Sequence, residues 1–557
     1  MADQIRFLTV RRSAAVAVSV VAVDAILSGL AHAVVNHDAV AYRGWLPPET
    51  HLVSIIVGLA LLTLVPRLLR GTRTALSVAT AGICVLAALS AATDHWWQVA
   101  VQLTLCLLLM RARRAFPLGS RNRPRRTYAA AALGAWMAAY GALRLVPLVH
   151  VHLRHIVPAL HHGVVVSRLS GAWLPVIEVL IGCAALISAL ALRSLMRPQP
   201  AENGHAEHEY RAAKAIVERH GRDSLSPFIL RPDKALQFAA GGVLSYRVVG
   251  GTAIVSSDPV APDGAAADAL ASFLPMARAR GWQVALWAAS ARHLEDYRRL
   301  GLHALCVGEE AFVDPSRFTL EGRPVRKLRQ SVHRVARRGW QITVCEGRAI
   351  DLGLEQELEQ LEARWREAHP HLLGFAMSTG AFGTEVGPDD VYAIARGPEG
   401  ELGAVMRFFS HCGNLSLDTM RRVGETPNGL NEALVAHTLE YARDHGVPEV
   451  SLNYAGLAHV LRARPPRNPL RRFARGLALA VLRRHFQMDR LVRFNDKFSP
   501  EWRPRYLVYE SRLELPRSIV HVLQAEGYLP ELRRPRLRRP GTVLPRPLAG
   551  RAQARPG

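Results

Sequence analysis

The chain begins with long apolar segments separated by short polar connections. A bilayer core requires about 20 predominantly apolar residues per helix, and segments near that length recur throughout the first 197 residues. They lie at 13–35, 52–69, 75–93, 97–112, 127–149 and 172–196. The pattern predicts a six-span transmembrane region over residues 1–197. The first segment is not expected to be a cleavable signal peptide, because further spans follow it.

The positions of arginine predict how these spans are oriented. Arginines cluster before the first segment, after the second and after the fourth, as at Arg12, Arg70 and Arg113, whereas the other connections contain few. Positive residues favour the cytoplasmic side, so both termini and the remainder of the chain are expected to face the cytoplasm from a multi-pass position in the cell membrane. Asp24 and Glu178 lie within spans and are functional candidates by default; a polar contact between helices explains them equally well.

Beyond residue 197 the pattern changes to that of a globular protein. A polar stretch over 198–221 predicts a linker that enters an amphipathic helix. Short β-rich runs then alternate with helical ones, beginning with a hairpin that turns at Gly250 and Gly251. Helices are predicted at 265–280, 291–300, 353–369 and 430–445, and strands at 282–289, 402–409, 415–419 and 449–455. The order repeats, so we predict two tandem α/β units, 222–347 and 348–515, without a glycine-rich dinucleotide fingerprint, followed by a basic disordered tail at 516–557.

The charge balance narrows the choice of partners. A formal net charge of +24 raises the local concentration of polyanions, which makes anionic lipid and RNA both plausible, while an arginine-rich composition alone is the neutral alternative. The six cysteines form no CxxC pair. Neither a disulfide framework nor a zinc site is indicated.

Several runs in the globular part resemble one known family. They are "FILRPDKALQF", "VVGGTAIVSSDPV", "YRRLGLHALCVGEEAFVD", "RKLRQSVHRVARRGW", "SLDTMRR", "PNGLNEALV", "VSLNYA" and "RFNDKFSPEWRPRYLVYE". Over residues 222–515 the chain is similar to the cytosolic domain of aminoacyl-phosphatidylglycerol synthases, the multiple peptide resistance factor family, and "NGLNEALV" and "SLNYA" are most similar to its actinobacterial lysyl-transferring branch.

The resemblance implies a fold and an activity. The fold is a tandem pair of acetyltransferase-like (GNAT) units. The activity is transfer of an aminoacyl group, commonly lysyl, from charged tRNA to phosphatidylglycerol in the inner leaflet. The cationic product lowers the negative surface charge of the membrane and confers resistance to cationic antimicrobial peptides. A fused lysyl-tRNA synthetase module, frequent in that branch, is not expected in this chain, and a homo-oligomer is an open alternative.

The exchange of one ester for another requires no ATP, metal or cofactor, but it does require a positioned base. Asp418, at the end of a predicted strand, suits the base or the binder of the amino group. Glu310 and its neighbour Glu309 are the other carboxylates within a matching run, and we take Asp418 and Glu310 as catalytic candidates. A solvated or capping carboxylate is the structural alternative for each.

The remaining candidates are binding residues. Asn428, Asn431 and Glu432 open a predicted helix, where an Asn cap is the alternative, and Asn453 interrupts an apolar strand. Lys497, Arg503 and Arg505 suit a phosphate, because guanidinium forks bind phosphate bidentately; pairing with Asp496 and Glu501 is the alternative. Together with Glu309 and Asp258, from matching runs, these are the predicted substrate-binding residues.

Two basic helices are predicted in addition. Arg326, Lys327 and Arg329 begin one of them, which is either a charged outer face or a track for tRNA phosphates. The other, at 470–482, is basic and amphipathic, which suits the inner leaflet or packing onto its own domain.

Two further functions remain open from the sequence. One is a related transferase that uses another aminoacyl or acyl donor, although no pyrophosphate-binding loop for coenzyme A is visible. The other is a lipid transporter whose cytosolic domain is inert, although the predicted spans carry few polar residues. Labelling of lipid from charged tRNA discriminates between them.

Overall fold

A computed structural model describes residues 2–35, 49–69, 71–92, 95–116, 203–369, 375, 387–456 and 488–530. The chain divides into two compact units, Met1–Gln199 with Met276–Trp282, and Pro200–Pro275 with Gln283–Gly557. Each is described by itself. The predicted spans at 127–149 and 172–196, and the predicted basic helix at 470–482, lie outside the described residues.

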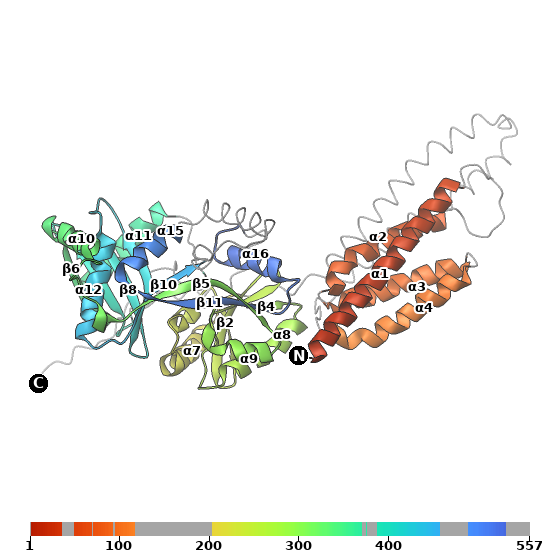
Figure 1. The fold of residues 1–557 in the computed structure, drawn as a ribbon, viewed down its shortest axis with the longest axis horizontal. Helices are drawn as coiled ribbons and strands as arrows, with labels where there is room; N and C mark the ends of the chain where they lie inside the picture. Colours follow the sequence, from red (N-terminus) through yellow and green to blue (C-terminus); the bar gives the residue numbers. More distant parts are fainter. Residues whose placement is uncertain are drawn as a thin grey trace, which may run out of the picture. The chain divides into compact units, whose positions relative to one another are not determined.

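The described part of the first unit is helical. Its elements are α1 (Ala2–Val35), α2 (Glu49–Leu69), α3 (Arg73–Ala92), α4 (Trp96–Arg111) and η1 (Ala112–Ala115), which fall on the first four predicted spans (Figure 1). Small residues let α1 and α2 approach closely: a side chain at Gly58 would come within 2.7 Å of the Ala22 carbonyl. Val18, Leu61 and Ile83 are buried in the core that the helices share.

One of the described helices, over Arg73–Ala91, is long and apolar enough to cross a bilayer, and the apolar part of α2, Val53–Leu69, is shorter. A single helix of this kind does not establish a multi-pass protein, because buried core helices have the same length and composition. The six-span topology therefore stays a prediction.

The second unit is an α/β domain. Its helices are α7 (Glu207–His220), η3 (Ser226–Leu230), α8 (Ala266–Ala279), η4 (Ala291–His293), α9 (Leu294–Arg299), η5 (Pro315–Arg317), α10 (Arg326–Arg337), η6 (Gly347–Ala349), α11 (Leu352–Ala368), α12 (Leu430–Asp444), α15 (Met488–Asn495), η7 (Asp496–Phe498) and α16 (Leu515–Ala525). Its strands are β1 (Ala235–Ala239), β2 (Gly242–Val249), β3 (Thr252–Ser256), β4 (Gln283–Ser290), β5 (His303–Val313), β6 (Gln341–Glu346), β7 (Val391–Arg396), β8 (Leu402–His411), β9 (Asn414–Arg422), β10 (Val450–Gly456) and β11 (Glu501–Tyr509).

All of these strands belong to one mixed sheet, in the order β1-β2-β3-β4-β11-β5-β10-β9-β8-β7-β6. The two halves share a connectivity. In each, an antiparallel run is followed by a helix and then by a strand parallel to the last one: β3, α8 and β4 in the first half, β9, α12 and β10 in the second. The predicted α/β class is confirmed.

The C-terminal strand β11 links the halves. Although it follows β10 in the chain, β11 lies between β4 and β5 and pairs antiparallel with both. The first half of the sheet is therefore completed by a strand from the far end of the domain. The tail predicted to be disordered, 516–557, begins within α16 (Leu515–Ala525), whose Val522 is buried. The prediction is therefore wrong for the first residues of the tail, because the apolar face of this helix packs against the sheet. Most of the predicted tail lies outside the described residues.

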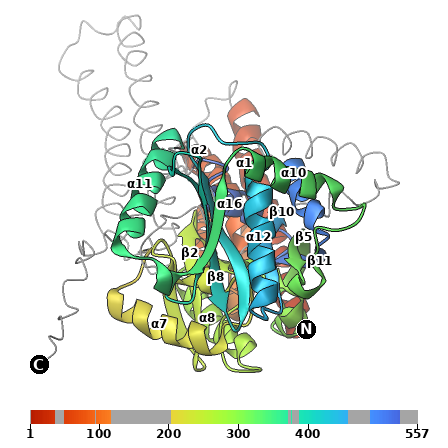
Figure 2. The same ribbon diagram turned by 90° about the vertical axis from the view of Figure 1, so that its left-hand side faces the viewer.

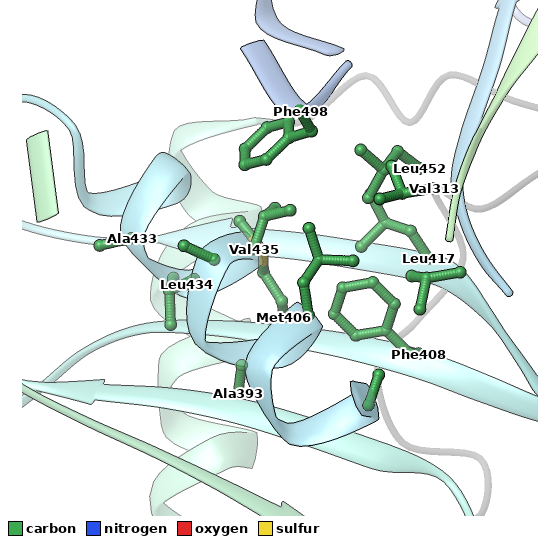
Figure 3. Close-up of a cluster of buried hydrophobic side chains, with 14 of the residues drawn as sticks. Val313, Ala393, Met406, Phe408, Leu417, Ala433, Leu434, Val435, Leu452 and Phe498 are labelled. Carbon is green, nitrogen blue, oxygen red and sulfur yellow. The ribbon is translucent and has the colours of Figure 1, made fainter. Parts of the chain in front are cut away.

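Helices cover both faces of the second half. Figure 2 shows α11 and α12 on opposite sides of β8. Alternating residues of β8 and β9 face α12, where Met406, Phe408 and Leu417 pack with Leu434 and Val435 (Figure 3). On the α11 side Leu358 and Leu361 pack against Tyr392 and Val405. This two-sided burial is what requires the polar side chains described next to find partners inside the protein.

Candidate active site

Two clusters of charged and polar side chains, most of them buried, lie in the sheet or beside it. The first, the seam cluster, joins the two halves and consists of Asp223, Ser224, Glu310, Ser451 and Arg505. The second, the β8–β9 cluster, belongs to the second half and consists of Asp390, Tyr392, Arg407, Asp418 and Thr419. The rings of Phe228 and Phe409 meet edge to face, with their centres 5.3 Å apart.

The seam cluster is centred on Arg505 of β11, which is 2% exposed. Its guanidinium donates to Glu310 Oε2 from Nε at 2.6 Å, to Asp223 Oδ2 at 2.8 Å and to the Ser224 hydroxyl at 2.8 Å. Glu310 of β5 is fully buried and also accepts from the hydroxyls of Ser224 at 2.6 Å and Ser451 at 2.5 Å. The ion pair between Arg505 and Glu310 and its hydrogen bonds thus join four segments of the chain: residues 223–224, β5, β10 and β11.

This arrangement decides what Arg505 and Glu310 can do. Burial raises the pKa of Asp223, but the charge and the hydrogen bond of Arg505, together with the hydrogen bond from the Leu225 amide, outweigh it, so the pKa is lowered. The carboxylate oxygens of Glu310 already accept hydrogen bonds from Arg505, Ser224 and Ser451. Most of the N–H donors of the Arg505 guanidinium are likewise used within the protein. The geometry therefore suits them to positioning the strands.

The β8–β9 cluster is centred on Arg407 of β8. Its Nε donates to Asp418 Oδ2 at 2.6 Å, and a second guanidinium nitrogen contacts the same oxygen. Arg407 also lies 4.8 Å from the centre of the Phe409 ring. Burial raises the pKa of the nearby Asp390 to about 6, although Arg407 opposes the shift, and burial raises the pKa of Tyr392 to about 12.

The sheet opens beside this cluster. The ladder between the parallel strands β9 and β10 consists of Leu415 with Val450 and Ser416 with Ser451, so the strands part before Asp418 is reached. The Thr419 hydroxyl is buried and has no hydrogen-bond partner in the part of the chain that the structure describes. A buried polar atom without a partner is costly, and at an opening between strands it is a natural contact for a bound molecule.

The predicted binding residues do not gather in one place. Asn428, Asn431 and Glu432 do gather at the start of α12, where Lys497 pairs with Glu432 at 2.5 Å. Arg503 pairs with Glu449 at 2.5 Å and with Glu501 at 2.9 Å. Its pairing with Glu501 is the alternative to phosphate binding that the sequence analysis left open.

The other predicted residues are placed as follows. Asp258 is occupied by the Ser290 amide at 2.9 Å and the Tyr297 hydroxyl at 2.8 Å. Glu309 lies in β5 opposite Pro504 and Ala455. Asn453 lies in β10 where the register with β5 is irregular. Arg326, Lys327 and Arg329 lie on α10.

Sequence reasoning missed several residues. Asp223, Ser224, Arg407 and Asp390 carried no motif. Asp223 and Ser224 are revealed by partners 282 and 86 residues away, whereas Arg407 and Asp390 are revealed by their burial beside Asp418. Lys234 was missed too: it is fully buried and donates to the Phe228 carbonyl and the Ser256 hydroxyl, each at 2.7 Å. Its position inside the matching run "FILRPDKALQF" was the available signal. Among the described residues, no group of three or more His, Cys, Asp or Glu side chains could hold a metal ion.

The fold and the buried ionic groups define a class: an α/β protein with a mixed sheet that opens between two parallel strands. Residues 214–509 match the family described as phosphatidylglycerol lysyltransferase, C-terminal. Since this match covers more than half of the chain, the protein belongs to that family.

Individual relatives agree with this assignment. The lysylphosphatidylglycerol biosynthesis bifunctional protein LysX of Nocardia farcinica is 33% identical over 369 residues, which cover 64% of this chain and 32% of the relative. The protein of the same name from Mycobacterium tuberculosis is 33% identical over 359 residues, with 63% and 30% covered. The chain thus matches about a third of the length of these relatives.

One solved structure supports the fold. It is the C-terminal domain of a putative lysylphosphatidylglycerol synthetase from Agrobacterium fabrum, which aligns with a TM-score of 0.50 at 24% identity over 58% of this chain and 99% of that domain.

Proposed function

We propose that this protein transfers an aminoacyl group, with lysyl as the first choice, from charged tRNA to phosphatidylglycerol. The observation that carries the proposal is the family match over residues 214–509, because it runs through both halves of the sheet and includes both clusters. The cationic product would lower the negative charge of the membrane surface and confer resistance to cationic antimicrobial peptides.

We place the reaction at the β8–β9 cluster. The glycerol hydroxyl of the lipid attacks the carbonyl carbon of the aminoacyl ester, a tetrahedral intermediate forms, and the ester bond to the tRNA breaks. The lipid hydroxyl loses a proton to a base, and the departing ribose hydroxyl gains one. No net oxidation occurs, and one ester replaces another.

Asp390 suits the proton transfer. A general base works best with a pKa near the working pH, and burial raises the pKa of Asp390 to about 6. Asp418, the residue favoured from the sequence, then supplies the negative charge that attracts the aminoacyl ammonium, while Arg407 fixes its orientation. The Thr419 hydroxyl is a donor for the reacting ester group. Glu310, the other sequence candidate, is assigned to positioning together with Arg505.

The remaining predicted residues keep a role in this proposal as substrate contacts. Asn428, Asn431, Glu432 and Lys497 border the start of α12, Asn453 lies on the strand that parts from β9, and Glu309 and Arg503 lie on the neighbouring strands. Asp258 resembles a structural residue because its oxygens accept from the protein itself.

The finer architecture belongs to the same proposal. The shared connectivity of the two halves supports tandem acetyltransferase-like units, and the four described helices of the first unit support a membrane region. Six spans with both termini in the cytoplasm, and a homo-oligomer, stay predictions.

The test uses membranes that contain the full chain. Labelled lysyl-tRNA should transfer its label to a lipid, and ribonuclease treatment beforehand should abolish the transfer. Mass spectrometry of lipids from a host that lacks aminoacylated lipids identifies the product. Labelling from free lysine and ATP in ribonuclease-treated membranes would exclude the proposed donor.

A further inference from the structure

Helices α3 and α4 form a hairpin whose facing sides carry two thiols. Cys84 lies on α3 and Cys106 on α4, 22 positions further along the chain, and their sulfur atoms are 3.5 Å apart. The Cys106 sulfur also lies 3.6 Å from the carbonyl oxygen of Thr80 on α3. A side chain of one helix therefore touches the backbone of the other, so the two helices are in close contact at this level.

The packing around the two cysteines fixes their positions. Ile83 and Leu86 beside Cys84, and Leu109 beside Cys106, are buried in the core that the helices share. Cys106 itself is 3% exposed, whereas Cys84 is exposed at the surface of the helices. One thiol is thus accessible to a small reagent, and the second is held beside it inside the protein.

The two sulfur atoms are close enough to be joined. A disulfide has an S–S distance of about 2.05 Å, so the sulfurs would have to approach by about 1.5 Å, and a rotation of each side chain about its Cα–Cβ bond contributes to this movement. In the part of the chain that the structure describes, no other two thiols lie within 4.0 Å of each other. The pair is therefore a specific place for a covalent link.

We propose that Cys84 and Cys106 are the site of a reversible disulfide, which a hydroperoxide forms and a dithiol reductant removes. The Cys84 sulfur attacks one oxygen of the hydroperoxide, the O–O bond breaks, and the leaving oxygen takes the thiol proton and departs as an alcohol or water. Cys84 is then a sulfenic acid. The Cys106 sulfur displaces its hydroxyl group as water and forms the S–S bond. Two thiols thus lose two hydrogens, and the hydroperoxide gains two electrons.

The order of the steps and the class of oxidant follow from exposure and depth. An accessible cysteine beside a second, resolving thiol is the arrangement of redox-sensing pairs. Cys84 and Cys106 lie about 12–15 Å along their helices from the turn that joins them, which in the predicted topology is near the middle of a bilayer core about 30 Å thick. Uncharged hydroperoxides enter this region, whereas charged reagents are excluded by the cost of leaving water.

The bond would link α3 covalently to α4 and restrict the unfolded chain between them. Cys84 and Cys106 belong to the first unit, whereas both clusters discussed for aminoacyl transfer belong to the second. The inference therefore goes beyond the proposed function and does not depend on it.

The test uses membranes that contain the full chain. They are treated with tert-butyl hydroperoxide and dissolved in sodium dodecyl sulfate with N-ethylmaleimide, which blocks free thiols, and the protein is digested with trypsin. No Lys or Arg lies between Arg73 and Arg111. Both cysteines therefore fall in the single peptide 74–111, and mass spectrometry of this peptide reports their state directly.

Untreated membranes should give the peptide with two maleimide groups. Treated membranes should give it without either group and lighter by two hydrogens than the unmodified peptide, and dithiothreitol added before the maleimide should restore both groups. In Cys106→Ser the sulfenic acid of Cys84 has no resolving thiol, so it should react with dimedone. Cys84→Ser should give less of the corresponding adduct on Cys106, because that thiol is buried.

The matched control moves one thiol by a single position. Cys84→Ser combined with Val85→Cys keeps two cysteines at the same depth, but position 85 is turned by about 100° around α3. Val85 is 46% exposed, so its replacement leaves the core intact. This variant should form no disulfide under conditions that convert the unmodified protein.

Three results would overturn the inference. The first is a treated, unmodified protein that keeps both maleimide groups or carries only sulfinic acids. The second is equal disulfide formation in the variant with the displaced thiol, which would show that the distance between the sulfurs is unimportant. The third is a link from Cys84 or Cys106 to Cys183, which appears as two joined tryptic peptides. Aminoacyl transfer does not enter any of these measurements, so failure of the proposed function leaves the test unaffected.

Discussion

Arg503 and Arg505 lie two residues apart on β11, yet their surroundings differ. Arg505 is buried between Glu310 and Asp223, whereas the Arg503 side chain is 43% exposed and pairs with Glu449 and Glu501. From the sequence they were equivalent candidates for binding a phosphate. Burial separates them, because removing one partner of a buried ion pair leaves an uncompensated charge, while an exposed pair is screened by water.

The two arginines should therefore differ in stability. Arg505→Met should lower the free energy of unfolding by about 3–5 kcal/mol, because Glu310 loses its partner in a dry site. Arg503→Met should lower it by about 1 kcal/mol or less. Urea midpoints of the two variants measure the difference, and equal losses would show that the seam cluster does not hold the sheet together.

The carboxyl groups of the β8–β9 cluster should be separable by kinetics. If Asp390 is the base, the transfer rate of the unmodified protein should rise with pH through about 6, and Asp390→Asn should lower kcat by at least about 10²-fold. Asp418→Asn should mainly raise KM for aminoacyl-tRNA. The reverse pattern, with the large loss of kcat at Asp418, would return the role of the base to that residue.

Lys234 gives a pH-dependent stability. Burial lowers its pKa from 10.5 to about 7, so the unfolded chain binds a proton there that the folded chain does not bind between these values. Stability should therefore rise with pH across the window from 7 to 10.5, by several kcal/mol at about 1.4 kcal/mol per pKa unit. Lys234→Met should remove this rise. Urea midpoints at pH 7 and pH 9 test it, and an equal rise in the variant would assign the dependence to another group.

At the scale of elements, α12 is the helix whose position the substrate contacts depend on. Its N-cap is Gly429, with φ +97°, a left-handed conformation that other residues adopt at a cost. The start of α12, which carries Asn431 and Glu432, lies beside α10. The 3.6-residue periodicity of the sequence predicted the bounds of α12 closely. It could not show that Ser331 of α10, about 100 residues earlier in the chain, approaches Gly429 so closely that a side chain there would collide with it.

Gly429→Ala should consequently impair both stability and substrate binding. We expect a loss of about 1–3 kcal/mol from the strained φ, with an additional displacement of α10, since the new Cβ would lie 2.7 Å from the Ser331 Cβ. Adding Ser331→Gly should relieve the overlap but not the strain, so stability should recover only in part. Gly413→Ala is the control for φ strain alone, because its φ is +79° and a Cβ there meets nothing within 4 Å. Equal effects at both glycines would mean that the α10 contact is unimportant.

At the scale of the whole α/β unit, the sheet cannot be divided at the boundary between the two predicted units. β11 supplies the strand between β4 and β5, and without it the buried residues Val307 and Ala285 would lose their neighbour Leu507. Exposed strand edges of this kind promote aggregation.

Expression of fragments tests this dependence. A fragment of residues 203–347 should be insoluble or unfolded, whereas 203–530 should fold. Supplying residues 488–530 as a separate chain should restore solubility to 203–456 by strand complementation. Circular dichroism and gel filtration measure the outcome, and a folded, monomeric 203–347 fragment would show that β11 is dispensable to the first half.

The sequence by itself determined the class of fold, most elements and the family. Periodicity placed α8, α11 and α12 to within a residue or so at each end, because the faces of a helix are encoded locally. The resemblance of "SLDTMRR" and "PNGLNEALV" to the family, rather than periodicity, placed Asp418 and the start of α12 among the site candidates.

The tertiary structure alone decided which charges are buried and which partners they have. Arg407 and Asp418 are only 11 residues apart on neighbouring strands, and there the tertiary structure decided that both side chains are buried beside Asp390. Arg505 pairs with Asp223 and Glu310 across 282 and 195 residues, contacts that no local pattern records. The insertion of β11 between β4 and β5 has the same origin. Local preferences specify elements, whereas burial and long-range pairing assign chemistry to their side chains.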